Sequence, residues 1–187
     1  MHFASNGIGF QQISEKAYQD ILIVKHIKME NKNIEDQYIE AQTEATKLLA
    51  SLKIAKSAPR KILGLDGWIF EQTVRHAIEE ELKKEKIHCE PKEQEAIVGK
   101  AKVDLVFGRA AIEVKVSGFY SDVEDKYLKY RKKLEEKGLE YFYVTLYEDY
   151  QRNVEVAKRV FGMNRMFILG YEGEWERFIK ELISIIK

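Results

Sequence analysis

The 187-residue chain contains one cysteine and two prolines, and it has no net charge. A single thiol, Cys89, cannot form an intramolecular disulfide or hold zinc by itself, so a reducing compartment, the cytoplasm, is expected. Thirty-one basic and thirty-one acidic residues cancel. The chain therefore exerts no general attraction on polyanions, and any nucleic-acid site must arise from the local placement of charges.

Long apolar runs are also missing. None approaches the roughly 18 residues needed to cross a bilayer, and residues 1–16 lack the basic start and the apolar stretch of a signal peptide. We therefore expect no membrane segment. What the chain has is a hydrophobic share of 45% and a charged share of 33%, which predict a globular protein with one sizeable core.

The first third of the chain is helical in character, over residues 13–29 and 34–56. The second of these segments repeats apolar residues at intervals of three or four, which is typical of one helix face. Pro59 then interrupts the pattern. We expect an N-terminal helical extension over residues 1–60 and a second domain over residues 61–187.

Helices and strands alternate in the second domain. A helix is expected over residues 67–85, with Asp66 as its N-cap. The aromatic run 141–147, YFYVTLY, favours a buried strand over a base-stacking platform. The order of elements predicts an α/β or α+β fold built on one mixed sheet. After the first helix the pattern predicts a strand, a hairpin, a helix, a strand, a short helix, a strand and a last helix, over residues 87–97, 101–117, 121–137, 140–147, 151–160, 165–170 and from 174 onward.

Residues 103–116, VDLVFGRAAIEVKV, place charges inside two apolar runs. If Gly108 and Arg109 form a two-residue turn, the register sets Asp104 directly across from Glu113. Two carboxylates about 5 Å apart repel each other, so in a half-buried setting the pair lowers stability or one member takes up a proton. A divalent cation removes this cost, and Mg²⁺ is usually held by one or two carboxylates, waters and a substrate phosphate. The pair therefore predicts a metal site.

Lys115 lies two residues after Glu113, on the same face of the strand. An ammonium group there can position an attacking water and stabilise negative charge that develops at a phosphorus centre. The alternative is an exposed sheet face, on which Glu113 forms solvated ion pairs with Lys102 or Lys115 that contribute under roughly 1 kcal/mol each.

The hairpin resembles the signature of the PD-(D/E)XK nuclease superfamily, whose core has a helix, three strands, a helix and a strand. Here the signature reads Asp104, eight intervening residues and then Glu113-Val114-Lys115, and the resemblance covers about residues 62–147. It implies an α/β, restriction-endonuclease-like core, a central mixed sheet flanked by helices. It also implies that Asp104, Glu113 and the main-chain carbonyl of Val114 bind Mg²⁺, while Lys115 assists the attacking water.

The same family often supplies a further acidic residue from the preceding helix, in a G-x-x-x-E setting. Gly67 and Glu71 match this pattern, so the resemblance implies that Glu71 is a fourth catalytic and metal-binding residue. Two positions depart from the family. Val103 replaces the signature proline, and Tyr127 stands where many relatives carry glutamine, so no particular subfamily is assigned.

Two basic clusters are candidate nucleic-acid contacts. Lys126, Lys129 and Lys133 lie along one side of the helix that follows the hairpin, where they can contact phosphates. A solvated helix face explains the same lysines equally well. Arg60 and Lys61 form the second cluster, near the break between the two domains.

Together these features predict an Mg²⁺-dependent DNA nuclease, an endonuclease, with Mn²⁺ as a substitute ion and no small-molecule cofactor. A single site cuts one strand, so cleavage of a duplex leads us to expect a homodimer. Two alternatives stay open: a non-catalytic nucleic-acid-binding or assembly module on a nuclease-like scaffold, and a helical partner-binding role centred on residues 13–56. The fold does not select among restriction, repair, resolvase and mobile-element roles.

Overall fold

The computed structural model describes residues 33–51, 65–99, 101–118, 124–148 and 150–186. The chain divides into two compact units, residues 1–69 and residues 70–187. The helix predicted over residues 13–29 and the domain boundary predicted after residue 60 both lie outside the described residues, so these two remain predictions.

The first unit contains helix α2 (Ile34–Ser51) and the start of helix α3 (Leu65–Lys84). Tyr38 and Ala45 are buried on one face of α2, as the apolar intervals predict. Because α3 begins at Leu65, Asp66 lies in the first turn of the helix and not at the expected N-cap. Its carboxylate is engaged elsewhere, since the Tyr38 hydroxyl donates to Asp66 Oδ1 over 2.5 Å.

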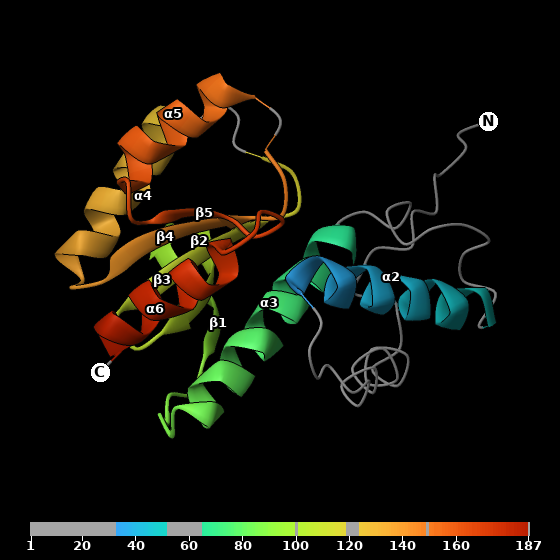
Figure 1. Ribbon diagram of the computed structural model, residues 1–187. Coiled ribbons are helices and arrows are strands. Elements are labelled where there is room, and N and C mark those ends of the chain that lie inside the picture. Colours follow the sequence, from blue (N-terminus) through green and yellow to red (C-terminus); the bar gives the residue numbers. More distant parts are fainter. Residues whose placement is uncertain (1–32, 52–64, 100, 119–123, 149, 187) are drawn as a thin grey trace, which may run out of the picture. The chain divides into compact units, whose positions relative to one another are not determined.

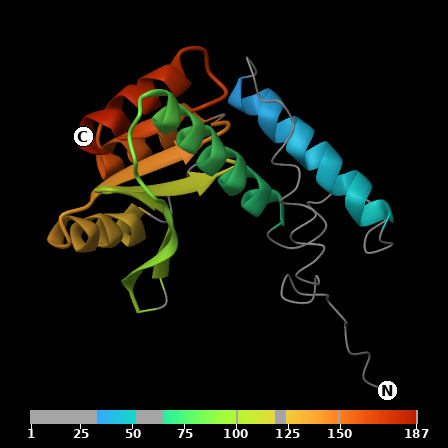
Figure 2. The same cartoon turned by 90° about the horizontal axis from the view of Figure 1, so that it is seen from below.

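The second unit is built on a five-stranded sheet with the strand order β1-β2-β3-β4-β5. Strands β1 to β5 span Lys92–Val98, Ala101–Phe107, Ala110–Lys115, Glu140–Thr145 and Met166–Ile168, and helices α4, α5 and α6 span Glu124–Glu136, Gln151–Phe161 and Glu174–Ile186. The first three strands pair antiparallel, whereas β4 runs parallel to β3 and β5 runs parallel to β4. The sheet lies between α4 and α6 in both views (Figures 1 and 2). The α/β class and the mixed sheet flanked by helices are therefore confirmed.

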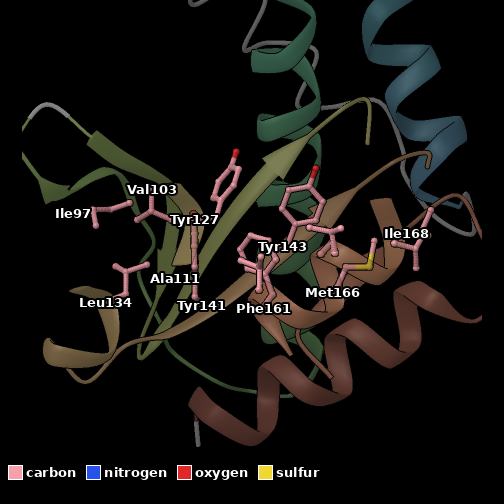
Figure 3. Packing of buried hydrophobic residues seen from close by; sticks show 14 of the residues in the cluster. Ile97, Val103, Ala111, Tyr127, Leu134, Tyr141, Tyr143, Phe161, Met166 and Ile168 are labelled. Atoms are coloured by element: carbon pink, nitrogen blue, oxygen red, sulfur yellow. The ribbon is translucent and has the colours of Figure 1, made fainter. Parts of the chain in front are cut away.

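Aromatic side chains fill the core between the sheet and the helices α4 and α5 (Figure 3). The ring of Phe161 lies 4.9 Å from the rings of both Tyr141 and Tyr143, measured between centroids. Contacts of this kind add to the free energy gained from burying the rings. The prediction that the run 141–147 is a buried strand is confirmed as far as Thr145, where β4 ends. Leu146 is still buried, whereas Tyr147 is 39% exposed.

Helix α6 covers the opposite face of the sheet. Successive residues of a strand point to opposite faces, so Phe142 of β4 points away from its tyrosine neighbours. Its ring stacks on Phe167 of β5, and Phe178 of α6 lies 5.2 Å from Phe167, measured between ring centroids. Within the described part of the chain, no helix combines the length and the apolar character needed to cross a membrane.

Candidate active site

The hairpin formed by β2 and β3 has the predicted register. Leu105 pairs with Ile112, and Gly108 in the turn has a φ of +55°, which glycine adopts without strain. Extending the same pairing by one residue sets Asp104 across from Glu113. The opposition of two carboxylates that the sequence predicts is therefore present in the structure.

One ammonium group joins the predicted site residues. Lys115 Nζ lies 3.0 Å from Asp104 Oδ2 and 2.6 Å from Glu113 Oε1, and it donates to the main-chain oxygen of Val114 over 3.0 Å. Because a single nitrogen reaches both carboxylates, their oxygens lie on the same side of the sheet and no further apart than the sum of the two distances. The result is a compact set of three oxygens around one cation.

Neutral groups hold both carboxylates in place. The Val114 N–H donates to Asp104 Oδ2 over 2.8 Å. The hydroxyls of Tyr127 and Tyr141 donate to the two oxygens of Glu113, over 3.3 Å and 3.2 Å. Glu113 is only 7% exposed, and these hydrogen bonds offset part of the cost of removing its charge from water.

Burial and neighbouring charges shift the pKa values of this cluster. Burial raises the pKa of Glu113 and Asp104 acts in the same direction, whereas the Lys115 ammonium opposes both. Burial alone would lower the pKa of Lys115, but Glu113 and Asp104 outweigh it and the pKa rises. Burial, reinforced by Glu113, also raises the pKa of Tyr127. Lys115 and Tyr127 therefore keep their protons near neutral pH and act as hydrogen-bond donors.

Helix α3 brings a further carboxylate, Glu71, to the edge of the site. Glu71 is 9% exposed, and Gln94 Nε2 lies 3.4 Å from Glu71 Oε1 and 3.5 Å from Asp104 Oδ1. Burial, followed by repulsion from Asp104, raises the pKa of Glu71 to about 7. Glu71 is thus linked to the site through the Gln94 amide.

Gln94 is a site residue that the sequence reasoning missed. It lies in β1 with a φ of +53°, a backbone conformation that costs a residue other than glycine about 1–3 kcal/mol. Its two neighbours in β1 pair with the residues on either side of Asp104, so Gln94 itself stands opposite Asp104. Strained residues of this kind persist where the surrounding structure holds them, often beside functional groups.

The three oxygens around Lys115 fit a small, hard cation. Mg²⁺ prefers carboxylate and carbonyl oxygens, and Asp104, Glu113 and Val114 already place such oxygens 2.6–3.0 Å from one positive centre. In the described segments, no three side chains of His, Cys, Asp or Glu gather into a group that could hold a metal. The fit therefore rests on two carboxylates and one carbonyl, and the role of Glu71 as a further ligand remains a prediction.

The structure exposes three of the predicted nucleic-acid-binding residues on α4, namely Lys126, Lys129 and Lys133. Tyr127 of the same helix reaches the site, so α4 connects this basic surface to the carboxylates. Lys133 also forms an ion pair of 2.6 Å with a glutamate one turn later. The other two predicted contacts, Arg60 and Lys61, lie outside the described residues.

No protein-family model matches the chain, and a search of curated proteins finds no match. Among solved structures, the complex of restriction endonuclease PspGI with its substrate DNA is similar to this chain with a TM-score of 0.47 and 11% identity. The match covers 91% of this chain and 80% of that chain.

Proposed function

We propose that the protein is an Mg²⁺-dependent nuclease that hydrolyses phosphodiester bonds in DNA. The observation that carries the proposal is the convergence of oxygens from Asp104, Glu113 and Val114 on one cation, the ammonium of Lys115. Such an oxygen set suits Mg²⁺. An ammonium beside it suits the stabilisation of charge at a phosphorus centre.

Each residue has a separate role in this proposal. Asp104 and Glu113, with the carbonyl of Val114, would hold the ion, which when bound polarises a phosphoryl oxygen and lowers the pKa of a water. Because Lys115 keeps its proton, it donates to the attacking water or to a phosphoryl oxygen and does not serve as the base. Two buried tyrosine hydroxyls keep the Glu113 carboxylate in position.

In this proposal the exposed lysines of α4 contact the DNA. Each contact between a lysine and a phosphate releases counterions, so binding through α4 weakens as salt rises. These contacts position the DNA without reading its sequence. Cleavage of both strands of a duplex would bring two copies of the chain together, because one site cuts one strand.

The test is digestion of plasmid, linear duplex and branched DNA with Mg²⁺, followed by mapping of the ends. Wild type is expected to cut at least one of these forms. Asp104→Ala and Lys115→Ala are expected to lose cleavage while circular dichroism shows that both remain folded. Lys102→Ala is the matched control, since Lys102 is an exposed lysine on the neighbouring strand. Residual activity equal to wild type in the first two variants would refute the proposal.

Calorimetry with Mn²⁺ gives a second measurement that does not depend on turnover. Wild type is expected to bind Mn²⁺, and Asp104→Ala is expected to bind it more weakly because one of the carboxylates is gone. Absence of Mn²⁺ binding, together with DNA affinity that is indifferent to metal, would support the non-catalytic binding module instead.

A further inference from the structure

Three exposed tyrosines lie just beyond the carboxyl ends of β4 and β5. Tyr147 follows β4, Tyr150 precedes α5, and Tyr171 follows β5; they are 39%, 70% and 53% exposed. Large aromatic side chains are normally drawn into the core, and the neighbouring tyrosines of β4 are buried there. We call Tyr147, Tyr150 and Tyr171 the tyrosine patch.

Short contacts between the two loops hold the patch together. The Tyr171 hydroxyl donates to the main-chain oxygen of Glu148 over 3.1 Å, and the N–H of Tyr150 donates to Glu148 Oε1, also over 3.1 Å. The N–H of Gly170 donates to the main-chain oxygen of the residue before Tyr147 over 3.0 Å. Glu148 itself is buried. Glu148 therefore holds the main chain at Tyr150 through its carboxylate and the hydroxyl of Tyr171 through its main-chain oxygen.

The patch adjoins the candidate active site through the main chain. Lys115 pairs with Thr145 across β3 and β4, and the N–H of Leu146 donates to the main-chain oxygen of Lys115 over 3.2 Å. Tyr147 is the next residue. The carboxyl ends of the parallel strands β3, β4 and β5 share one edge of the sheet (Figure 1), which is the edge at which ligands bind in α/β folds.

The charges near the patch are mixed. Arg152 is exposed two residues after Tyr150, and Glu172 is exposed directly after Tyr171. One arginine beside one glutamate attracts a phosphate backbone less than a group of several lysines does. Aromatic rings, in contrast, stack on any nucleobase whose face is accessible. In a fully paired duplex the base faces are covered by their neighbours, so the rings suit unpaired nucleotides.

We infer that the tyrosine patch binds one or two unpaired nucleotides beside the phosphodiester bond that is cut, and that the substrate is DNA with a single-stranded or splayed segment. This inference rests on the proposed nuclease function. The exposed lysines of α4 contact the phosphates, and the patch stacks on the bases. Binding through the lysines therefore weakens as salt rises, whereas stacking on the patch depends less on salt.

The test measures DNA binding by the Asp104→Asn variant, so that cleavage does not interfere. A duplex with a single-stranded arm carries the adenine analogue 2-aminopurine in that arm, because its fluorescence falls when it stacks. Three substitutions are compared in this background. Tyr150→Ala removes the most exposed ring, Tyr150→Phe keeps the ring, and Met163→Ala removes another exposed apolar side chain, which lies between α5 and β5.

Tyr150→Ala is expected to weaken binding of the duplex with the single-stranded arm, here called the armed duplex, about tenfold. It is also expected to remove the fluorescence decrease and to leave the dependence of affinity on salt unchanged. Tyr150→Phe and Met163→Ala are expected to behave like the parent, and affinity for a blunt duplex is expected to be the same in all four proteins. Lys129→Ala, in contrast, is expected to reduce the salt dependence for both DNAs.

Two outcomes would overturn the inference: equal fluorescence changes in Tyr150→Ala and Tyr150→Phe, or equal loss of affinity for the armed and the blunt duplex. Cleavage of the same DNAs by wild type with Mg²⁺ is measured separately. If wild type cuts while the patch variants bind normally, the patch is excluded and the nuclease function stands. If the patch variants lose binding but wild type never cuts, the binding site stands and the nuclease function fails.

Discussion

Two charged clusters lie at opposite edges of the same sheet, and they differ in charge balance. At the carboxyl end of β3, the one ammonium of Lys115 faces the carboxylates of Asp104 and Glu113. Glu71 adds a further carboxylate nearby, and its raised pKa of about 7 reflects burial and the repulsion from Asp104. These four residues have more acids than bases, and we call them the acidic cluster. Glu113 is almost completely buried.

The other cluster lies at the amino ends of β4 and β5. Arg165 donates to Glu140 Oε2 through two nitrogens, at 3.1 Å and 2.5 Å, and it binds Glu181 at 2.9 Å. Arg109 adds a second positive charge, 3.4 Å from Glu140. Two arginines face two glutamates, and we call these four residues the balanced cluster. All four side chains are half-buried or exposed.

The comparison shows that charge balance and burial, more than the presence of ion pairs, separate the two clusters. In the balanced cluster the positive and negative charges cancel. Partly exposed ion pairs of this kind make modest contributions to stability. The acidic cluster buries carboxylates that one ammonium does not fully compensate, which leaves it suited to a second cation. Substitutions in the two clusters should therefore differ in sign and in size.

The largest effect is expected for Lys115→Met, which keeps most of the length of the side chain but removes its charge. We expect nuclease activity to fall at least about 100-fold and the free energy of unfolding at pH 8 to fall by about 3 kcal/mol, because Asp104 and Glu113 lose their buried partner. Mg²⁺ should then raise the melting temperature of the variant more than that of wild type. Thermal melts with and without Mg²⁺ measure this. If Mg²⁺ changes the melting temperature of neither protein, the metal site is contradicted.

The next largest effect is the dependence of stability on pH, which Glu71 controls. In the folded protein the pKa of Glu71 is raised from 4.5 to about 7. Below pH 4.5 Glu71 is protonated in both the folded and the unfolded state and costs no stability, but as pH rises through 7 the folded protein must bury its charge and the free energy of unfolding falls. Glu71→Gln removes this loss. It is expected to stabilise the protein by up to about 3 kcal/mol at pH 8 and by almost nothing at pH 4. Urea unfolding at both pH values measures the difference.

The matched control for this pH effect is Glu140→Gln in the balanced cluster. It should destabilise the protein at pH 8, since it weakens the pairs with Arg165 and Arg109. A gain in stability in both variants would show that the two clusters are electrostatically alike, and the comparison would fail.

A smaller effect is expected for Arg165→Met. Loss of the paired nitrogens should lower the free energy of unfolding by about 1 kcal/mol, and less in high salt, because the side chains are partly exposed. Cleavage of DNA should stay at the wild-type rate when it is measured well below the melting temperature. A loss of activity comparable to that of Lys115→Met would place the balanced cluster in the functional machinery.

An effect on stability of similar size but opposite sign is expected for Gln94→Gly. Glycine adopts the left-handed backbone of residue 94 without strain, so we expect a gain in stability of about 1 kcal/mol. Because the amide between Glu71 and Asp104 is lost, activity should fall by about tenfold. Gln94→Ala is the control, since it also removes the amide but keeps the strain; a stability equal to that of Gln94→Gly would show that the backbone is not strained.

Local sequence patterns predicted much of the second unit. The turn at Gly108 and Arg109 sets the hairpin register, and alternation then places Asp104, Glu113 and Lys115 on one face, as the structure confirms. These relations span at most a dozen residues. Periodicity and turn chemistry act over that range, which is why they were sufficient.

Contacts between distant segments could not be predicted in the same way. The hydroxyl of Tyr141 meets Glu113 only because β4 pairs parallel to β3, and no local pattern fixes that register. The left-handed φ of Gln94 depends on its surroundings, not on its residue type. Asp66 lies within the first turn of α3, and the hydroxyl that donates to its carboxylate comes from Tyr38, which lies in another helix.

Val114 shows how a site can depend on a residue whose side chain takes no part in it. Its N–H donates to Asp104 and its carbonyl accepts from Lys115, while Val114 as a whole is only 6% exposed. An alanine or isoleucine scan would report this position as ordinary packing. Replacing the amide on its N-terminal side by an ester, which deletes one donor and leaves every side chain intact, would reveal a chemical role that side-chain mutagenesis cannot detect.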